Sequence, residues 1–214
     1  SEEGVFREIL LLREKLASVN DLEITLLAGG SQATFLPEKA IEKGFDHVIA
    51  GEGEIAFPAF LQNWLSGRKN EKVISVRPGL VNIDLFPGFH PSIGYLPPLE
   101  ITRGCRFGCA FCSVPRLQRG TLRHRSIDSV LQIAESYFKV KRNRRRIKFL
   151  SPNAFGYGSE DGKEPNFPAL RALLQALKDF GVPEISLGSF PSEVRPEFVS
   201  REILELVKPL ISNR

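Results

Sequence analysis

The first third of the chain alternates between helical and strand patterns of apolar residues. Residues 2–20 carry an apolar residue at every third or fourth position, which predicts an amphipathic helix. These apolar positions are Val5, Ile9, Leu12 and Leu16. The apolar-rich run 22–28 leads into two glycines, as expected of a buried parallel strand that turns sharply at its end.

A second strand and helix pattern follows. Pro37 is expected to begin a short helix and Gly44 to end it. Further elements are a strand over 46–50, a helix that ends at Ser66 and an edge strand over 72–76. This order of strands and helices predicts an α/β fold, in which residues 1–76 form part of a Rossmann-like domain.

Prolines and glycines are dense between residues 77 and 98, and we predict an interdomain linker there. The remainder, 99–214, repeats a strand followed by a helix three times. The strands are expected at 99–103, 146–151 and 184–189, and the helices at about 126–140, 167–180 and 196–211. Consecutive units of this kind predict part of a (βα) barrel, in which functional residues follow the strand ends.

Charge and hydropathy indicate where the protein is located and what its surface contacts. No run approaches the roughly 18 apolar residues that a membrane span requires, and we expect a cytoplasmic protein. The net charge is +4, and one ten-residue stretch is strongly basic. Its basic residues are Lys139, Lys141, Arg142, Arg144, Arg145, Arg146 and Lys148. We interpret this stretch as a solvated helix end, with contact to nucleic acid as the alternative.

The three cysteines of the chain, Cys105, Cys109 and Cys112, lie within eight residues directly after the predicted strand 99–103. An odd number of closely spaced cysteines does not suit disulfides, which predicts metal ligands in a reducing compartment. The spacing C-x₃-C-x₂-C can hold three irons of a [4Fe–4S] cluster and leave the remaining iron without a protein ligand.

Zinc is the alternative metal. A zinc site needs four ligands, and His124 is the nearest fourth candidate in the sequence. His124 lies between two arginines, and we interpret it as a surface residue. A non-catalytic zinc or nucleic-acid-binding module is therefore the alternative to an enzyme.

The segment from Glu100 to Cys112 resembles the signature of the radical S-adenosylmethionine (SAM) superfamily, C-x₃-C-x-Φ-C, with Phe111 at the aromatic position. The resemblance implies that the three cysteines hold a [4Fe–4S] cluster, that SAM binds the open iron and that Phe111 lies beside the adenine. It also implies an enzyme that takes an electron from an external donor and cleaves SAM to a 5′-deoxyadenosyl radical. The substrate and further catalytic residues stay unknown.

Two later turns fit the same resemblance. Members of the superfamily commonly contact the methionyl amine through the turn after the second barrel strand, where this chain has Ser151, Pro152 and Asn153. The end of the third strand resembles that of methylthiotransferase-like members, which makes Ser189 and Glu193 candidates for lining the cavity. An RNA methylthiotransferase, with RNA as its partner, is the alternative activity.

Residues 1–76 resemble the C-terminal half of the cobalamin-binding domain that precedes many radical SAM cores. The residues that carry this resemblance are Gly29 and Gly30 after one strand and Gly51 and Glu52 after the next. They imply cobalamin as a candidate cofactor, with glycine turns that leave room for its nucleotide tail. The sequence lacks the histidine motif of a lower cobalt ligand, and His47 is expected to be an ordinary strand residue.

The ends of the sequence suggest a piece of a longer protein. The chain begins at Ser1, contains no methionine and has three of the six strand and helix units of a radical SAM barrel. We therefore expect that both ends are shortened. An open parallel sheet exposes unpaired backbone groups at its last strand, so self-association of the piece is expected.

Overall fold

The computed structural model describes residues 2–20, 24–141 and 146–213, and it divides into two compact units, Ser1–Val81 and Asn82–Arg214. The division falls within the stretch predicted as a linker. Leu96, which belongs to that stretch, packs in the hydrophobic core of the second unit. Along the described residues, no helix combines the length and the hydrophobicity needed to cross a bilayer.

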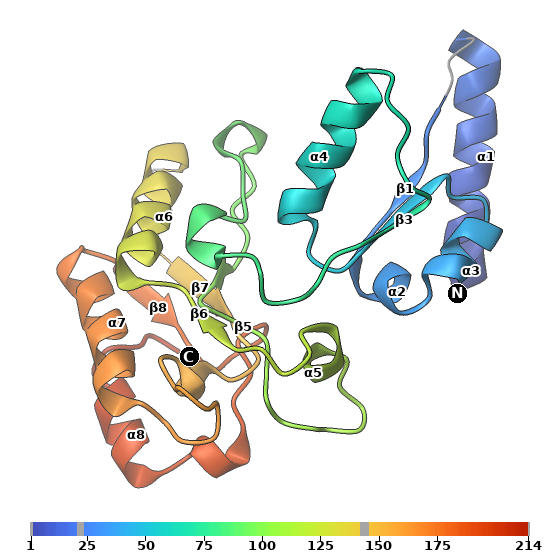
Figure 1. Ribbon diagram of the computed structural model, residues 1–214. Coiled ribbons are helices and arrows are strands. Elements are labelled where there is room, and N and C mark those ends of the chain that lie inside the picture. The colour runs from blue at the N-terminus through green and yellow to red at the C-terminus, as the bar shows by residue number, and fades with distance from the viewer. Residues whose placement is uncertain (1, 21–23, 142–145, 214) are drawn as a thin grey trace. The chain divides into compact units, whose positions relative to one another are not determined.

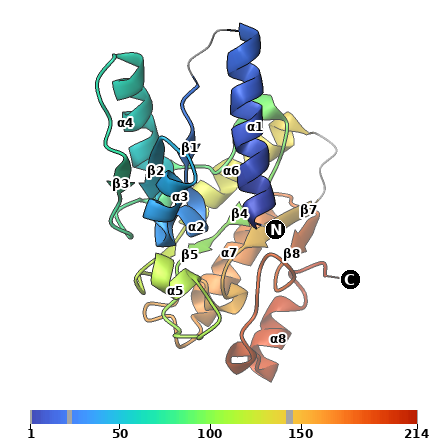
Figure 2. The same ribbon diagram turned by 90° about the vertical axis from the view of Figure 1, so that its right-hand side faces the viewer.

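The first unit is a three-stranded parallel sheet with flanking helices. Its strands are β1 (Leu27–Ala28), β2 (His47–Ala50) and β3 (Val73–Ser75), hydrogen-bonded in the order β1-β2-β3. Its helices are α1 (Glu2–Asn20), α2 (Gly30–Phe35), α3 (Pro37–Glu42) and α4 (Gly53–Leu65). Figure 1 places the strands between α4 and α1, and Figure 2 shows β1 and β2 between the same helices. The elements follow the predicted order, with α2 as an additional short helix after the first strand.

Helix α1 has the predicted bounds but turns a different face toward the unit. The ring of Phe6 packs edge-on against that of Phe45, with 5.8 Å between the ring centroids. Arg13 Nη1 donates to the carbonyl oxygen of Gly44 at 3.2 Å. Leu12, which belongs to the predicted apolar stripe, is 56% exposed. The stripe prediction is wrong at Leu12 because these tertiary contacts, which the apolar spacing does not reveal, set the rotation of the helix.

The second unit contains a parallel sheet in the order β4-β7-β8. Its strands are β4 (Leu99–Glu100), β7 (Arg146–Leu150) and β8 (Glu184–Ser186), and an antiparallel pair is made by β5 (Thr102–Arg103) and β6 (Arg123–His124). Its α-helices are α5 (Val114–Leu117), α6 (Ile127–Val140), α7 (Phe167–Asp179) and α8 (Arg201–Val207). Figure 1 shows α6, α7 and α8 in a row on one side of the strands. Within the described residues the sheet does not close into a barrel.

Two predicted elements of this unit are divided in the structure. The strand expected over 99–103 breaks at Ile101, whose N–H donates to Leu150 O at 3.1 Å while its carbonyl oxygen accepts from Arg125 N at 2.9 Å. The helix expected over 196–211 becomes the 3₁₀ turn η4 (Pro196–Phe198) and α8. Short 3₁₀ turns also lie at η1 (Ile83–Leu85), η2 (Pro91–Ile93) and η3 (Ala154–Gly156). Of the basic stretch, residues 142–145 lie outside the described part of the chain.

Arg125 connects the segments at the centre of this unit. Its side chain is fully buried and donates to Glu100 O at 2.8 Å, to Phe86 O at 2.9 Å and to Ser129 Oγ at 3.0 Å. Burial lowers the pKa of Arg125 below its ordinary value. The hydroxyl of Tyr157 donates to the Arg125 carbonyl oxygen at 2.7 Å. Arg125, which lies just before α6, therefore has a structural role: its guanidinium satisfies backbone carbonyl acceptors.

Candidate functional site

The three cysteines lie on one loop, which starts at the end of β5 and is closed at its base by the β5–β6 pair. Gly104 is the first residue of this loop and has a φ of +89°. A Cβ atom there would collide with the carbonyl oxygen of Thr121, so glycine is required. This turn directs the chain from the strand into the cysteine loop. Figure 1 shows that α5, which continues the same loop, lies away from α6, α7 and α8.

Cys105, Cys109 and Cys112 are free thiols, and each is partly exposed. Cys112 N–H donates to Cys109 O at 3.1 Å, so the last two cysteines share a turn. In the part of the chain that the structure describes, no three His, Cys, Asp or Glu side chains lie close enough together to hold a metal ion. The chemistry of the donor set still fits an iron–sulfur cluster, because three accessible thiols lie on one short loop.

His124, the candidate fourth ligand for zinc, has protein partners at both ring nitrogens. Nδ1 lies 2.9 Å from Thr102 Oγ1, and Nε2 lies 2.9 Å from Ser159 O. Burial lowers the pKa of His124, which favours the neutral ring. The interpretation of His124 as a surface residue is wrong, because the half-buried ring fastens the base of the cysteine loop to a neighbouring segment. A zinc ligand needs a free ring nitrogen, so these contacts disfavour the zinc alternative.

The turn after β7 holds Ser151, Pro152 and Asn153, the residues expected to contact SAM. Cys105, Pro152 and Asn153 line one small pocket, so the fold brings this turn to the cysteine loop. Asn153 is buried, and its Nδ2 has no hydrogen-bond partner among the described residues. An unsatisfied buried donor costs about 1–3 kcal/mol. Such a group beside a pocket indicates a position for an acceptor on a ligand.

The turn after β8 lies beside the turn after β7. Glu193 N–H donates to Ser151 O at 3.1 Å, and Ala154 N–H donates to Glu193 O at 2.7 Å. Ser189 is exposed in this turn. Ser192, by contrast, is fully buried, and its hydroxyl has no partner among the described residues. Sequence reasoning missed Ser192 because a serine in a turn carries no local signal of burial.

Arg195 is a second residue that sequence reasoning missed. Its Nη1 donates to Cys109 Sγ at 3.2 Å, and the guanidinium carbon lies 3.6 Å from the centre of the Phe107 ring. Its backbone N–H donates to Asn153 Oδ1 at 3.4 Å, and its Nη2 donates to Glu197 Oε1 at 2.7 Å. The hydrogen bond to Cys109 raises the pKa of Arg195. Arg195 and Cys109 are 86 residues apart in the chain, so no local motif connects them.

In the first unit, the residues predicted for cobalamin follow β1 and β2. Gly51 has a φ of +118°, and a Cβ atom there would collide with the carbonyl oxygen of Val76. Glu52 is buried, and its Oε2 accepts from the backbone N–H of Gly79 at 3.1 Å. Gly30, with a φ of +85°, begins α2. The fold itself therefore accounts for the residue types at Gly51 and Glu52.

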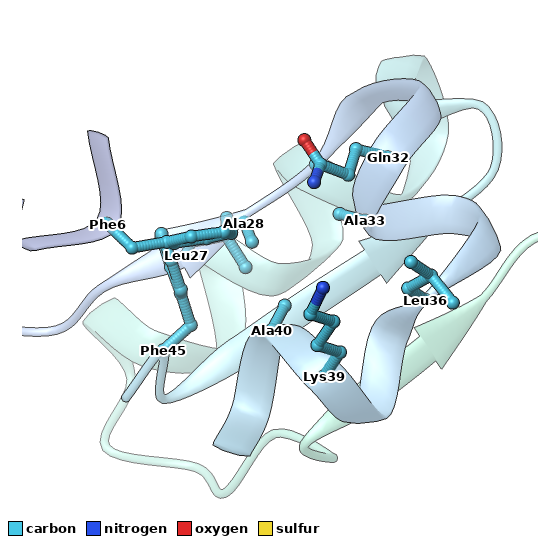
Figure 3. Close-up of a pocket in the computed structure, with 10 residues that line it drawn as sticks. Phe6, Leu27, Ala28, Gln32, Ala33, Leu36, Lys39, Ala40 and Phe45 are labelled. Carbon is cyan, nitrogen blue, oxygen red and sulfur yellow. The ribbon is translucent and has the colours of Figure 1, made fainter. Parts of the chain in front are cut away.

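A cavity of about 250 Å³ lies in the first unit against α1, β1, α2 and α3. Most of the side chains that line it are apolar, and Figure 3 shows the Gln32 amide and the Lys39 amine as the polar groups among them. Gly29 also lines this cavity. The predicted glycine turn after β1 therefore borders a space large enough for part of a ligand.

A parallel strand and helix repeat with three free thiols on one loop defines an α/β protein suited to iron–sulfur chemistry. A family model described as "Radical SAM superfamily" matches residues 99–214, and the chain belongs to this superfamily. The match confirms the family that the cysteine spacing predicts.

The curated relatives include proteins described as ribosomal protein uS12 methylthiotransferase RimO. The protein from Nostoc punctiforme is 29% identical over 131 residues, which cover 60% of this chain and 28% of the relative. The protein from Prochlorococcus marinus strain MIT 9303 is 24% identical over 189 residues, which cover 86% of this chain and 39% of the relative. The chain thus spans well under half the length of these relatives.

Among solved structures, the fold is similar to that of OxsB, a cobalamin-dependent SAM radical enzyme with aqua-cobalamin and SAM bound. The TM-score is 0.61, and the similarity covers 97% of this chain and 32% of OxsB at 16% sequence identity. At this identity the similarity shows the fold alone. It confirms the predicted α/β fold class.

Proposed function

We propose that the protein is a radical SAM enzyme in which Cys105, Cys109 and Cys112 hold a [4Fe–4S] cluster. The observation that carries the proposal is the placement of three free thiols on one accessible loop, in a chain that belongs to the superfamily. The chemistry that the cluster supplies when bound is one-electron reductive cleavage of SAM. An external donor provides the electron, and the free thiols favour a reducing, cytoplasmic location.

The chain's own residues bind and orient the cofactors. Asn153 Nδ2 is a hydrogen-bond donor, which suits a carboxylate oxygen of the methionyl group of SAM. Phe111 is 93% exposed, so its ring is available to cover the adenine. Ser151 and Pro152 shape the turn that carries Asn153, and Ser189 is proposed to line the substrate cavity.

Reductive cleavage of SAM tests the proposal directly. After anaerobic reconstitution with iron and sulfide, we expect wild-type protein to form methionine and 5′-deoxyadenosine when SAM and dithionite are added. Cys109→Ala is expected to abolish both products, because the cluster loses a ligand. Ser113→Ala changes an exposed residue on the same loop and is the matched control. Absence of products from iron-loaded wild type, or their persistence in Cys109→Ala, would contradict the proposal.

Methylthiotransfer is the second candidate reaction, favoured by the similarity to RimO proteins. The relatives' description refers to a ribosomal protein, so the substrate classes to test are protein and RNA. We would incubate the reconstituted enzyme, SAM, dithionite as the electron donor and a sulfur source with a uS12 peptide or with ribosomal RNA. A methylthio group gained by either substrate supports the candidate. Unchanged masses for both would count against it.

We also propose that the first unit binds cobalamin, supported by the overall similarity to OxsB and by the cavity beside Gly29. Retention of hydroxocobalamin on a desalting column is the measurement. Gln32→Trp is expected to block the cavity and reduce retention, whereas Gln62→Trp, on the exposed side of α4, is the control. Equal retention by both variants, or none by wild type, would contradict this assignment.

A further inference from the structure

Arg195 is held in place from several directions within the second unit. The face of the Phe107 ring lies 3.6 Å from its guanidinium carbon, and Phe107 itself packs edge-on against Phe198 with 6.3 Å between ring centroids. Glu197 Oε1 accepts from Nη2 at 2.7 Å, and the backbone N–H is tied to Asn153. A guanidinium stacked and paired in this way keeps one orientation, so its remaining donors are aimed before any ligand binds.

One of those donors points at a predicted cluster ligand. Arg195 Nη1 lies 3.2 Å from Cys109 Sγ, whereas its Nε is buried and has no partner among the described residues. Hydrogen bonds from a charged donor are roughly twice as strong as neutral ones. Hydrogen bonds to the sulfurs are among the features that set the reduction potential of an iron–sulfur cluster.

We propose that Arg195 is a positioning residue for the iron–sulfur site: its hydrogen bond orients the Cys109 sulfur and raises the midpoint potential of the cluster. The inference rests on the proposed function. Reduction adds one negative charge to the cluster, and a nearby guanidinium stabilises that charge more strongly in the reduced state than in the oxidised state. Arg195 therefore makes the cluster easier to reduce.

A redox titration followed by electron paramagnetic resonance tests this inference on the reconstituted protein. In Arg195→Gln we expect unchanged iron content, because all three thiols remain. The equilibrium constant for reduction should fall about tenfold, which for a one-electron couple is a shift of about 59 mV to lower potential. Arg201→Gln is the matched control, since Arg201 is a 91% exposed arginine paired with Glu205 on α8. Its midpoint potential should equal that of wild type.

Arg195→Lys keeps the positive charge but lacks the planar fork, so its midpoint potential should fall between those of wild type and Arg195→Gln. This variant also decides the question if Arg195→Gln fails to retain iron. Equal potentials in wild type and the Arg195 variants, with iron retained, would overturn the inference and leave the proposed function intact. A lower unfolding midpoint with an unchanged potential would show a merely structural role and overturn it too. Wild-type protein that binds no iron would instead overturn the proposed function, and the inference with it.

Discussion

The two units use the same feature, the turn after a parallel strand, in different ways. In the first unit, the residues of the turn after β2 contact other parts of the unit: Gly51 lies against Val76, and Glu52 accepts from a backbone N–H. In the second unit, the turns after β7 and β8 leave Asn153 Nδ2 and Ser192 Oγ buried without partners among the described residues. Glycine turns alone are therefore weak evidence of a ligand site. Buried polar groups that the fold leaves unsatisfied are stronger evidence.

The largest expected effect tests the claim that close packing shapes the cysteine loop. Gly104→Ala should destabilise the protein by about 3 kcal/mol or more, because it combines a left-handed backbone with a collision at Thr121 O. Gly120→Ala is the matched control on the same loop, where φ is +69° and the added Cβ meets open space. It should cost about 1 kcal/mol. Equal losses in urea denaturation would show that the Thr121 contact does not constrain the loop.

A smaller effect tests the buried network beneath the site. Burial raises the pKa of Tyr157 to about 12, and its hydroxyl donates to Arg125 O. The unfolded chain has a tyrosine pKa of about 10, so the folded state favours the neutral phenol, and this stabilisation is lost as the pH rises from 10 to 12. The stability difference between wild type and Tyr157→Phe should therefore shrink by about 2 kcal/mol across that range.

Urea denaturation at several pH values from 8 to 12 measures this difference. Tyr95→Phe is the control, because Tyr95 is 68% exposed. A constant difference between wild type and Tyr157→Phe across the range would contradict the assignment of a buried, neutral phenol.

The smallest expected effect on stability comes from a comparison of two asparagines. Asn153 has an amide nitrogen without a partner among the described residues, whereas the side chain of Asn166 is hydrogen-bonded. Asn153→Leu should change the free energy of unfolding by less than about 1 kcal/mol, because removing the buried Nδ2 donor, which has no partner among the described residues, offsets the loss of the long 3.4 Å hydrogen bond that Oδ1 accepts from Arg195 N–H. Asn166→Leu should cost about 1–2 kcal/mol, because Asn166 Oδ1 caps α7 by accepting from Ala169 N at 3.0 Å. Equal losses for the two variants would contradict this distinction.

The same pair distinguishes ligand binding from folding. Asn153→Leu should weaken SAM binding to the reconstituted protein about tenfold, the loss expected for one hydrogen bond to a charged acceptor. Asn166→Leu should leave the affinity unchanged. Equilibrium dialysis with labelled SAM measures both. An unchanged affinity in Asn153→Leu would remove the argument that its amide faces the cofactor.

Local patterns were sufficient for most elements of the fold. Helix α1 and strand β2 match their predicted ranges within a residue, because helix and strand periodicity is a property of neighbouring residues. The β5–β6 pair was not predicted, since it depends on Ile101 bonding to Leu150 on one side and Arg125 on the other. Complete burial of Arg125 has no sequence signal either, because arginine is usually exposed.

The residues of the candidate site also fall into two groups, those that the sequence predicted and those that it did not. The cysteine loop was predicted from residue type and spacing within a short segment, whereas the turn at Asn153 was predicted from the family resemblance, by its position after the second barrel strand. Ser192 and Arg195 could not be predicted, because each acquires its role through packing against segments far away in the chain. Contacts between distant segments are what the structure adds to the sequence.

Mössbauer spectroscopy of protein reconstituted with iron and sulfide tests the central claim most directly. The account predicts about four irons per chain, as in a [4Fe–4S] cluster, with one iron distinct from the other three because it lacks a cysteine. Added SAM should change the signal of that one iron. A spectrum that SAM leaves unaltered, or a colourless protein with stoichiometric zinc, would contradict the account.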